Sequence, residues 1–205
     1  MLENGIAQDP LTLGSMETTA SVYLPKLLAT YHQANPMVQL SLNTGTTADN
    51  LERVLSREFD TAFVAGPINH PDLEQQIFTI EDLVLVTGKI EPADTPWRDL
   101  KHQTLLVFPY GCCYRKVLEQ LVQQEGITPE HIIEFNSLGA ILASICAGLG
   151  ISLLPTSVVE PYLSDGIMSS FTIPEAHSVI STVLVYRKDH YMNTAFREFL
   201  KIAKG

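Results

Sequence analysis

One pattern in the sequence restricts the possible folds more than any other. A strand, a polar turn and a helix follow one another over residues 11–57, and the same order returns over residues 104–149. Short apolar runs closed by glycine, asparagine or proline are typical of strands, and apolar residues three and four positions apart are typical of helices. Strands that alternate with helices form βαβ units around largely parallel sheets. The repetition therefore predicts two similar α/β lobes.

The first lobe draws its elements from residues 11–86. Strands are expected over 11–13, 38–43, 61–65 and 83–86, and a polar turn over 15–19. The first helix should tolerate Pro25 in its first turns and stop at Asn35-Pro36. The second should begin at Thr46-Thr47, because threonine hydroxyls cap helix N-termini. The apolar faces of the two helices are expected to consist of Leu24, Leu27, Leu28 and Tyr31, and of Leu51, Val54 and Leu55.

The second lobe repeats this order. Strands are expected over 104–108, 132–135 and 151–154, followed by a last strand over 182–186, and residues 88–96 should link the two lobes. One helix should end at Gly126. The next should begin at the cap Asn136-Ser137 and end near Gly148. The apolar faces of these helices and of a closing helix are expected to be Tyr114, Val117, Leu118, Leu121 and Val122; Leu138, Ile141, Leu142, Ile145, Cys146 and Leu149; and Phe196, Phe199 and Leu200.

These elements define the expected domain organisation. One lobe should comprise residues 11–87 plus 185–205 and the other residues 91–181, with the chain crossing between them near 87–91 and near 181–186. Each lobe would be a Rossmann-like subdomain, and the two crossing segments would act as hinge strands. Ligands of open α/β sheets bind outside the carboxyl ends of the strands. The polar turns should therefore converge on a cleft between the lobes.

The composition limits the classes of function. The chain has 205 residues, a formal net charge of −10 and a pI of about 4.9. A surface this acidic repels phosphate backbones, so we do not expect this chain to bind DNA by itself. No apolar run approaches the roughly 20 residues that cross a bilayer, so we expect no contact with a membrane. The N-terminus carries no secretory signal, and a cytoplasmic location is expected.

Signs of metal, cofactor or catalytic chemistry are missing from the sequence. The three cysteines form no C-x-x-C pair, and the six histidines are not at metal-ligand spacing. An odd cysteine count with an adjacent pair favours a reducing compartment. The motifs G-x-S-x-G, P-loop, H-E-x-x-H and G-x-G-x-x-G do not occur. We therefore expect no metal, no cofactor and no enzymatic activity.

Four segments, in the right order, resemble the effector-binding domain of LysR-type transcription regulators. Residues 13–28 followed by Asn35-Pro36 are similar to the opening of that domain, with its Leu-Pro-x-Leu-Leu helix. Residues 45–55 and 59–64 resemble its next helix and strand. Residues 136–138 with 147–155, and finally 184–200, are similar to its later stretches. The match covers nearly the whole chain.

The resemblance implies a two-lobe, periplasmic-binding-protein-like (type 2) fold that binds a small polar effector, by default an organic acid or inorganic anion. It also implies a homodimer or tetramer, and DNA binding only through a helix-turn-helix domain absent from this sequence, with residues 1–10 as the end of its linker. Two alternatives stay open, a solute-binding protein of a transporter and a small α/β enzyme. The residues expected to contact the ligand are Ser15, Glu17, Thr18, Thr19, Thr46, Thr47, Ala65, Gly66, Gly111, Cys112, Cys113, Tyr114, Arg115, Asn136 and Ser137.

Several of these residues allow a second interpretation. The threonines and Ser137 could simply cap their own helices rather than bind an anion. Glu17 could favour a cationic or hydroxylated effector, or could stabilise the first turn of its helix. Arg115 could clamp a carboxylate or lie on the surface.

The cysteines and one arginine add further expectations. Cys112 and Cys113 could form a redox sensor at a helix N-terminus, whereas Cys146 is expected to pack as a small hydrophobic residue. Arg57 stands where the resembling family tends to have glycine, and this difference is expected to be a surface detail.

Overall fold

The computed structural model describes residues 7–89 and 102–204, which divide into two compact units. Unit 1 comprises the described residues up to Ile80 and from Ser181, and unit 2 those from Glu81 to Ile180. The chain passes from one unit to the other within β4 (Leu73–Gly88) and returns within β9 (Val179–Arg187). The expected limits lay at 87, 91, 181 and 185, so the first passage comes earlier in the chain. Most of the expected linker 88–96 lies outside the described residues.

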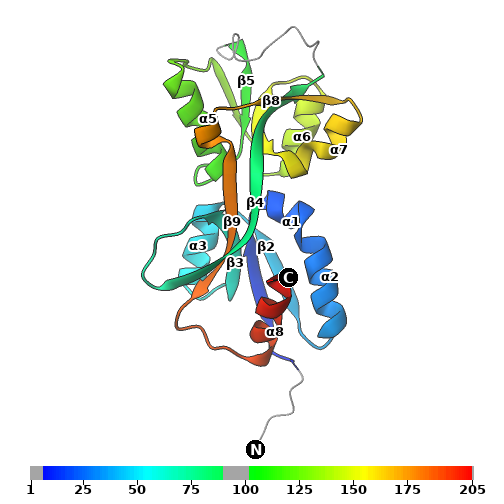
Figure 1. The fold of residues 1–205 in the computed structure, drawn as a ribbon, viewed down its shortest axis with the longest axis vertical. Helices are drawn as coiled ribbons and strands as arrows, with labels where there is room; N and C mark the ends of the chain where they lie inside the picture. The colour runs from blue at the N-terminus through cyan, green and yellow to red at the C-terminus, as the bar shows by residue number, and fades with distance from the viewer. Residues whose placement is uncertain (1–6, 90–101, 205) are drawn as a thin grey trace, which may run out of the picture. The chain divides into compact units, whose positions relative to one another are not determined.

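Unit 1 is built on a sheet in the order β2 (Leu40–Thr44), β1 (Leu11–Ser15), β3 (Thr61–Gly66), β9. β1 runs parallel to both β2 and β3, and β9 runs antiparallel to β3. Helix α3 (Thr47–Leu55) covers one face of this sheet. Helices α1 (Glu17–Val22), α2 (Leu24–Ala34) and α8 (Thr194–Ala203) cover the other (Figure 1). This is the two-sided arrangement that parallel strands require.

The alternation of side chains along β3 divides the core of unit 1 into two layers. Phe63 packs with the residues of α2 and α8, including Tyr31 and Phe199. Ala62 and Val64 pack on the opposite face against Val54 of α3. The Tyr31 hydroxyl also donates a hydrogen bond of 2.8 Å to the Ala195 carbonyl, which joins α2 to α8. Burial of this hydroxyl, with the charge of Glu198, raises the pKa of Tyr31 to about 12.

The expected polar turn over 15–19 is wrong beyond Met16. Residues from Glu17 onward form α1, whose first hydrogen bond joins the Ala20 amide to the Met16 carbonyl at 2.9 Å. α1 and α2 are separate helices that meet at Tyr23, because Pro25 has no amide to continue the α1 hydrogen bonds. Pro25 therefore lies in the first turn of α2, as predicted, and α2 ends at Asn35, as predicted.

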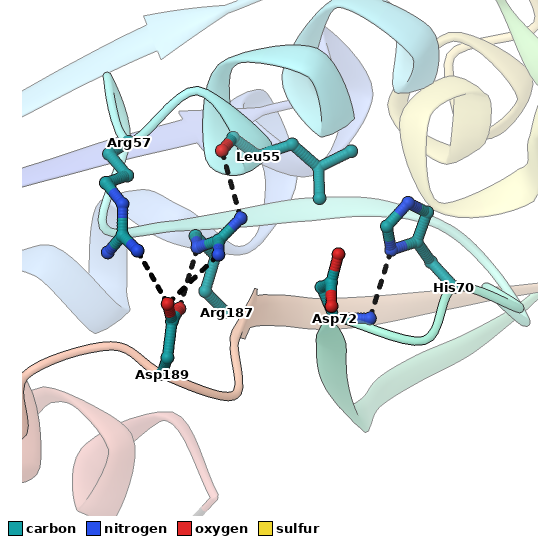
Figure 2. A network of polar contacts seen from close by, with 6 residues as sticks. All are labelled: Leu55, Arg57, His70, Asp72, Arg187 and Asp189. Carbon is teal, nitrogen blue, oxygen red and sulfur yellow. Dashed lines mark hydrogen bonds and ion pairs between the residues drawn. The ribbon is translucent and has the colours of Figure 1, made fainter.

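Arg57 lies at the surface and takes part in an ion-pair network. Its backbone has a φ of 68°, in the left-handed region where glycine is favoured. Its guanidinium lies 2.6 Å from Asp189, which also accepts hydrogen bonds of 2.8 Å and 3.0 Å from Arg187 (Figure 2). Arg187 in turn donates to the Leu55 carbonyl at 3.1 Å. The network fastens the end of α3 to the segment between β9 and α8.

Unit 2 is built on a second sheet, in the order β8 (Met168–Thr172), β4, β7 (Ile151–Pro155), β5 (Thr104–Val107), β6 (His131–Glu134). β5 runs parallel to β6 and β7, and β4 runs antiparallel to β7 and β8. Helix α5 (Cys113–Gln124) lies on one side of these strands. Helices α6 (Leu138–Cys146) and α7 (Thr156–Ser164) lie on the other side (Figure 1). A short 3-10 helix, Glu175–His177, precedes β9.

The buried face of α6 matches the prediction only as far as Ile145. Leu138, Ile141, Leu142 and Ile145 are buried. Cys146 is exposed, so its expected packing as a core residue is wrong. The chain turns away at Gly148, whose φ is 76°, and Leu149 is exposed for the same reason. α7, which contains Pro161, and β8 were not predicted.

Among residues 7–89 and 102–204, no helix is both long and apolar enough to cross a membrane.

Candidate functional site

The side chains of the turn after β1 are largely buried. Ser15 is fully buried, and its hydroxyl donates to the Met16 carbonyl at 2.9 Å. Thr18 and Thr19 are 2% and 0% exposed, because α1 turns both side chains inward. The Thr19 Oγ1 is buried without a hydrogen-bond partner among the described residues, and the expected contact of the two threonines with a ligand stays a prediction. Glu17 is half-buried and is the acidic residue of the first turn of α1.

The turn before α3 uses its polar groups internally. Thr46 caps the helix in a reciprocal capping box, in which its hydroxyl accepts from the Asp49 amide and its own amide donates to the Asp49 carboxylate, both at 3.2 Å. The Thr47 hydroxyl accepts from the Ala65 amide at 3.2 Å and lies 3.5 Å from the Met16 sulfur. The carboxyl ends of β1, β2 and β3 thus lie close together in unit 1, as predicted. The residues that follow these strands contact one another there.

Gly66 closes β3 at a close approach between strands. A Cβ atom at this position would lie 2.6 Å from the side chain of Val183 on β9, so a larger residue would push the two strands apart. The close packing of β3 against β9 therefore explains why this position is a glycine.

In unit 2, the turn before α5 holds the adjacent cysteines. Gly111 has a φ of 91°, and Cys112 is the N-cap of α5 but makes no side-chain cap hydrogen bond. Cys112 and Cys113 are half-buried and free of disulfides. Tyr114 is buried, and the centre of its ring lies 6.4 Å from that of Phe108, so its ring packs in the core of unit 2.

Arg115 is buried, and its guanidinium already has hydrogen-bond partners within the chain. It is 6% exposed and donates to the Phe108 carbonyl at 3.1 Å, to Glu119 at 2.8 Å and to Glu134 at 2.6 Å. Burial by itself lowers the pKa of Arg115, but the hydrogen bonds to Glu119 and Glu134 outweigh it, and the net shift is upward. Carboxylates of the chain already hold this guanidinium, so its placement does not favour the expected contact with a ligand carboxylate.

Tyr110 was missed by the sequence interpretation. The centre of its ring lies 3.5 Å from the guanidinium carbon of Arg115, and the residue is 75% exposed. This contact depends on a cation five positions along the chain in a different element, and no local pattern signals it. Asp49, by contrast, stands three residues after Thr46, which is the spacing of a capping box and was a readable signal.

The turn before α6 remains open. Ser137 is the N-cap of α6 but makes no side-chain cap hydrogen bond, and the first turn contains no acidic residue. Asn136 and Ser137 are both exposed. The Phe135 amide donates to the Val107 carbonyl at 2.9 Å, so this turn lies beside the carboxyl end of β5. Amides at a helix N-terminus attract negative charge. This turn therefore has the polar groups that an acidic ligand needs.

No group of three or more His, Cys, Asp or Glu side chains that could hold a metal ion occurs within the part of the chain that the structure describes.

Comparison with known proteins identifies the class and the family. The fold matches effector-binding domains of transcription regulators. The effector-binding domain of QuiR in complex with shikimate aligns with a TM-score of 0.77 at 21% identity, covering 96% of each chain. The regulatory domain of MetR from N. meningitidis aligns with a TM-score of 0.77 at 19% identity, covering 95% of this chain and 92% of that one. The predicted periplasmic-binding-protein-like (type 2) fold is thereby confirmed.

The sequence comparisons agree with the fold. The LysR substrate binding domain family matches residues 5–205, and this chain belongs to that family. The HTH-type transcriptional regulator GltR of Bacillus subtilis (strain 168) is 44% identical over 200 residues, 98% of this chain. The HTH-type transcriptional regulator CzcR of Bacillus anthracis is 41% identical over 195 residues, 93% of this chain.

The chain spans 68% of the length of GltR and 65% of that of CzcR. These relatives are transcription regulators, as the resemblance predicted, and not enzymes. They favour a regulator domain over the solute-binding protein of a transporter.

Proposed function

We propose that this chain senses a small polar metabolite for a LysR-type regulator that binds DNA through a helix-turn-helix domain outside this sequence. The membership of residues 5–205 in the LysR substrate binding domain family carries this proposal. The net charge of −10 supports it, because such a chain needs a separate module for DNA. Regulators of this kind act on DNA in the cytoplasm, which is the location we propose.

We further propose that an acidic group of the effector binds at the start of α6. Asn136 and Ser137 are exposed there, and the helix begins without a side-chain cap or an acidic residue. The exposed residue Gly111 lies in the neighbouring turn that precedes α5. At the corresponding turns of unit 1, Glu17 and Asp49 already supply carboxylates. An acidic group is therefore favoured at the start of α6 over these two turns, where it would meet a carboxylate.

The decisive experiment is a thermal-shift screen of organic acids, including shikimate and benzoate, on wild type, Ser137→Asp and Ser137→Ala. Aspartate is a good N-cap, so Ser137→Asp should fold at least as stably as wild type while repelling an anion. A stabilising acid should lose most of its effect on Ser137→Asp and part of it on Ser137→Ala. If the same acid stabilises all three proteins equally, α6 is not its site.

We also propose that the chain pairs with a second copy through the outer strands of its sheets. β2 is the end strand of the unit 1 sheet, and β6 is the end strand of the unit 2 sheet. All four residues of β6 are exposed, among them Ile132 and Ile133, and Leu42 of β2 is exposed as well. Unpaired apolar edges are suited to partner strands. A stable homodimer should bury roughly 1,200–2,000 Å² in total.

The dimer is tested by light scattering at micromolar concentration on wild type and Ile133→Lys. Wild type should have the mass of two chains, and the charged edge should shift the protein toward the monomer. A wild-type protein that stays monomeric contradicts the homodimer. A dimer unaffected by Ile133→Lys places the contact elsewhere.

Control of DNA binding requires a difference in effector affinity between two states of the regulator. A difference of about 1.4 kcal/mol changes the ratio of the states tenfold. The chain alone should leave duplex DNA unshifted at physiological salt. A specific shift would mean that the DNA-binding surface lies in these 205 residues.

A further inference from the structure

Two thiol groups stand side by side at the point where the turn after β5 enters α5. Cys112 and Cys113 are adjacent in sequence, half-buried and not bridged. The Cys113 thiol donates a hydrogen bond to the sulfur of Cys112. Because the two residues are consecutive, their side chains leave the backbone at neighbouring positions, and rotation about the Cα–Cβ bonds can bring both sulfur atoms to one ligand atom.

The two thiols differ in acidity. The hydrogen bond from Cys113 lowers the pKa of Cys112 against the opposing effect of burial, and the backbone amides of Arg115 and Tyr114 lower it further. The same hydrogen bond, together with burial, raises the pKa of Cys113 well above its ordinary value. Since the thiolate is the nucleophile and the ligand, Cys112 is the first sulfur to attack and Cys113 carries the proton.

Hydrogen bonds hold the backbone of Cys112 and the side chain of Arg115 at the start of α5. The Cys112 amide donates to the Pro109 carbonyl, and the Cys112 carbonyl accepts from the Lys116 amide, both at 3.2 Å. Arg115, two residues further on, is fixed by Phe108, Glu119 and Glu134. A pre-positioned pair loses little conformational freedom when it chelates a ligand.

A ligand of this pair must be one that needs only two bonds to protein sulfur atoms. Structural zinc takes four protein ligands, and the described residues hold no group of three or more His, Cys, Asp or Glu that could bind a metal ion. A trivalent arsenic compound differs, because it is thiophilic, forms two bonds to neighbouring sulfurs and keeps its third substituent. Soft thiolates select soft centres of this kind.

We propose that Cys112 and Cys113 form a dithiol site that captures trivalent arsenic compounds. With phenylarsine oxide, the Cys112 and Cys113 sulfurs each form a bond to arsenic. The arsenic–oxygen bond breaks, and the oxygen leaves as water with the two thiol protons. Arsenic stays trivalent, and no oxidant or reductant is consumed. This site does not depend on the proposed effector function, and it is tested without any effector.

The first test uses the unaltered, reduced protein and phenylarsine oxide. Mass spectrometry should show one phenylarsenic group per chain, stable to 2-mercaptoethanol and removed by 2,3-dimercaptopropanol. Subsequent iodoacetamide labelling and peptide mapping should find Cys112 and Cys113 protected and Cys146 labelled. Cys146 is the internal control, because it is exposed but has no neighbouring thiol partner in the sequence. Protection of Cys146, or labelling of both Cys112 and Cys113, overturns the proposal.

The second test uses Cys112→Ser, Cys113→Ser and Cys146→Ser. Loss of either sulfur of a chelating pair should weaken phenylarsine oxide binding by at least about a hundredfold, while Cys146→Ser should bind as wild type does. Circular dichroism establishes that each variant is folded, and the mapping on wild type stands if one is not. If both Cys112→Ser and Cys113→Ser bind like wild type, the proposal fails. An effector that still stabilises these variants leaves the effector proposal intact.

Discussion

Units 1 and 2 follow the same strand–turn–helix order, but the corresponding helices α3 and α6 begin differently. In unit 1, α3 is capped by its own Thr46–Asp49 box, and Thr47 contacts Ala65. In unit 2, neither α5 nor α6 has a side-chain cap hydrogen bond. Two arginines, one in each unit, differ in their burial. Arg57 of unit 1 pairs with Asp189 at the exposed surface, whereas Arg115 of unit 2 is buried among its partners.

The difference indicates a division of tasks. A helix start that caps itself is stable but has little left for a ligand, whereas an uncapped start offers free amides at some cost in stability. Unit 2 combines two uncapped helix starts with a buried arginine that holds β6 to α5. We infer that Arg115 stabilises the strands and helices around the open start of α6.

The largest expected effect comes from Arg115→Ala. This change removes a buried cation, leaves the Phe108 carbonyl without its donor and takes away the support of Tyr110. Glu119 and Glu134 are 40% and 48% exposed and can rehydrate, so the loss should be about 2–3 kcal/mol. Urea unfolding followed by circular dichroism measures it. Glu119→Gln, which keeps the other two contacts, should cost clearly less. A variant as stable as wild type would show that Arg115 does not hold unit 2 together.

The capping contrast predicts the next effect. Thr46→Ala should destabilise by about 1 kcal/mol, because the Asp49 amide loses its acceptor. Ser137→Ala should change stability by only a few tenths of a kcal/mol, because no cap hydrogen bond is lost. The two variants are compared by urea unfolding under identical conditions. Equal losses would remove the distinction between the starts of α3 and α6.

A smaller change is expected at Arg57. A left-handed backbone costs a non-glycine residue about 1 kcal/mol of stability, and Arg57→Gly should remove this cost. The change also removes an exposed ion pair, which contributes little to stability at physiological salt. In thermal unfolding at about 150 mM salt, which is close to physiological ionic strength, the variant should be as stable as wild type or slightly more so. A clear loss of stability would show that the network of Figure 2 carries more than its exposure suggests.

The smallest effect concerns acid. Hydrogen bonds and charge from Arg187 and Arg57 lower the pKa of Asp189 to about 2. The ionised form is thus favoured in the folded chain, so its contribution is present above the unfolded pKa of about 3.9 and is lost as the pH falls through about 2. Between these pH values wild type should lose stability more steeply than Asp189→Asn. Parallel pH profiles would contradict this assignment.

Local patterns in the sequence were sufficient for much of the fold. The short apolar run of residues 61–65, closed by Gly66-Pro67, predicted β3, and the spacing Leu138, Ile141, Leu142 and Ile145 predicted the buried face of α6. The threonine pair predicted the start of α3. These signals are readable because the groups that interact are near neighbours or repeat with the period of the element. α7 and β8 lacked such a signal, since a proline interrupts the helix pattern and only Met168 of β8 is buried.

The state of the candidate site residues was decided only by tertiary structure. Arg115 meets Glu134, 19 residues away in another element, and Thr47 meets Ala65, 18 residues away. Thr18 and Thr19 are buried because α1 packs them inward, and Cys146 is exposed because α6 ends there. The sequence determined which polar residues gather at the ends of strands. Packing between distant segments determined which of them have hydrogen-bonding groups left for a ligand, because a donor or acceptor is consumed by whichever partner the fold brings to it.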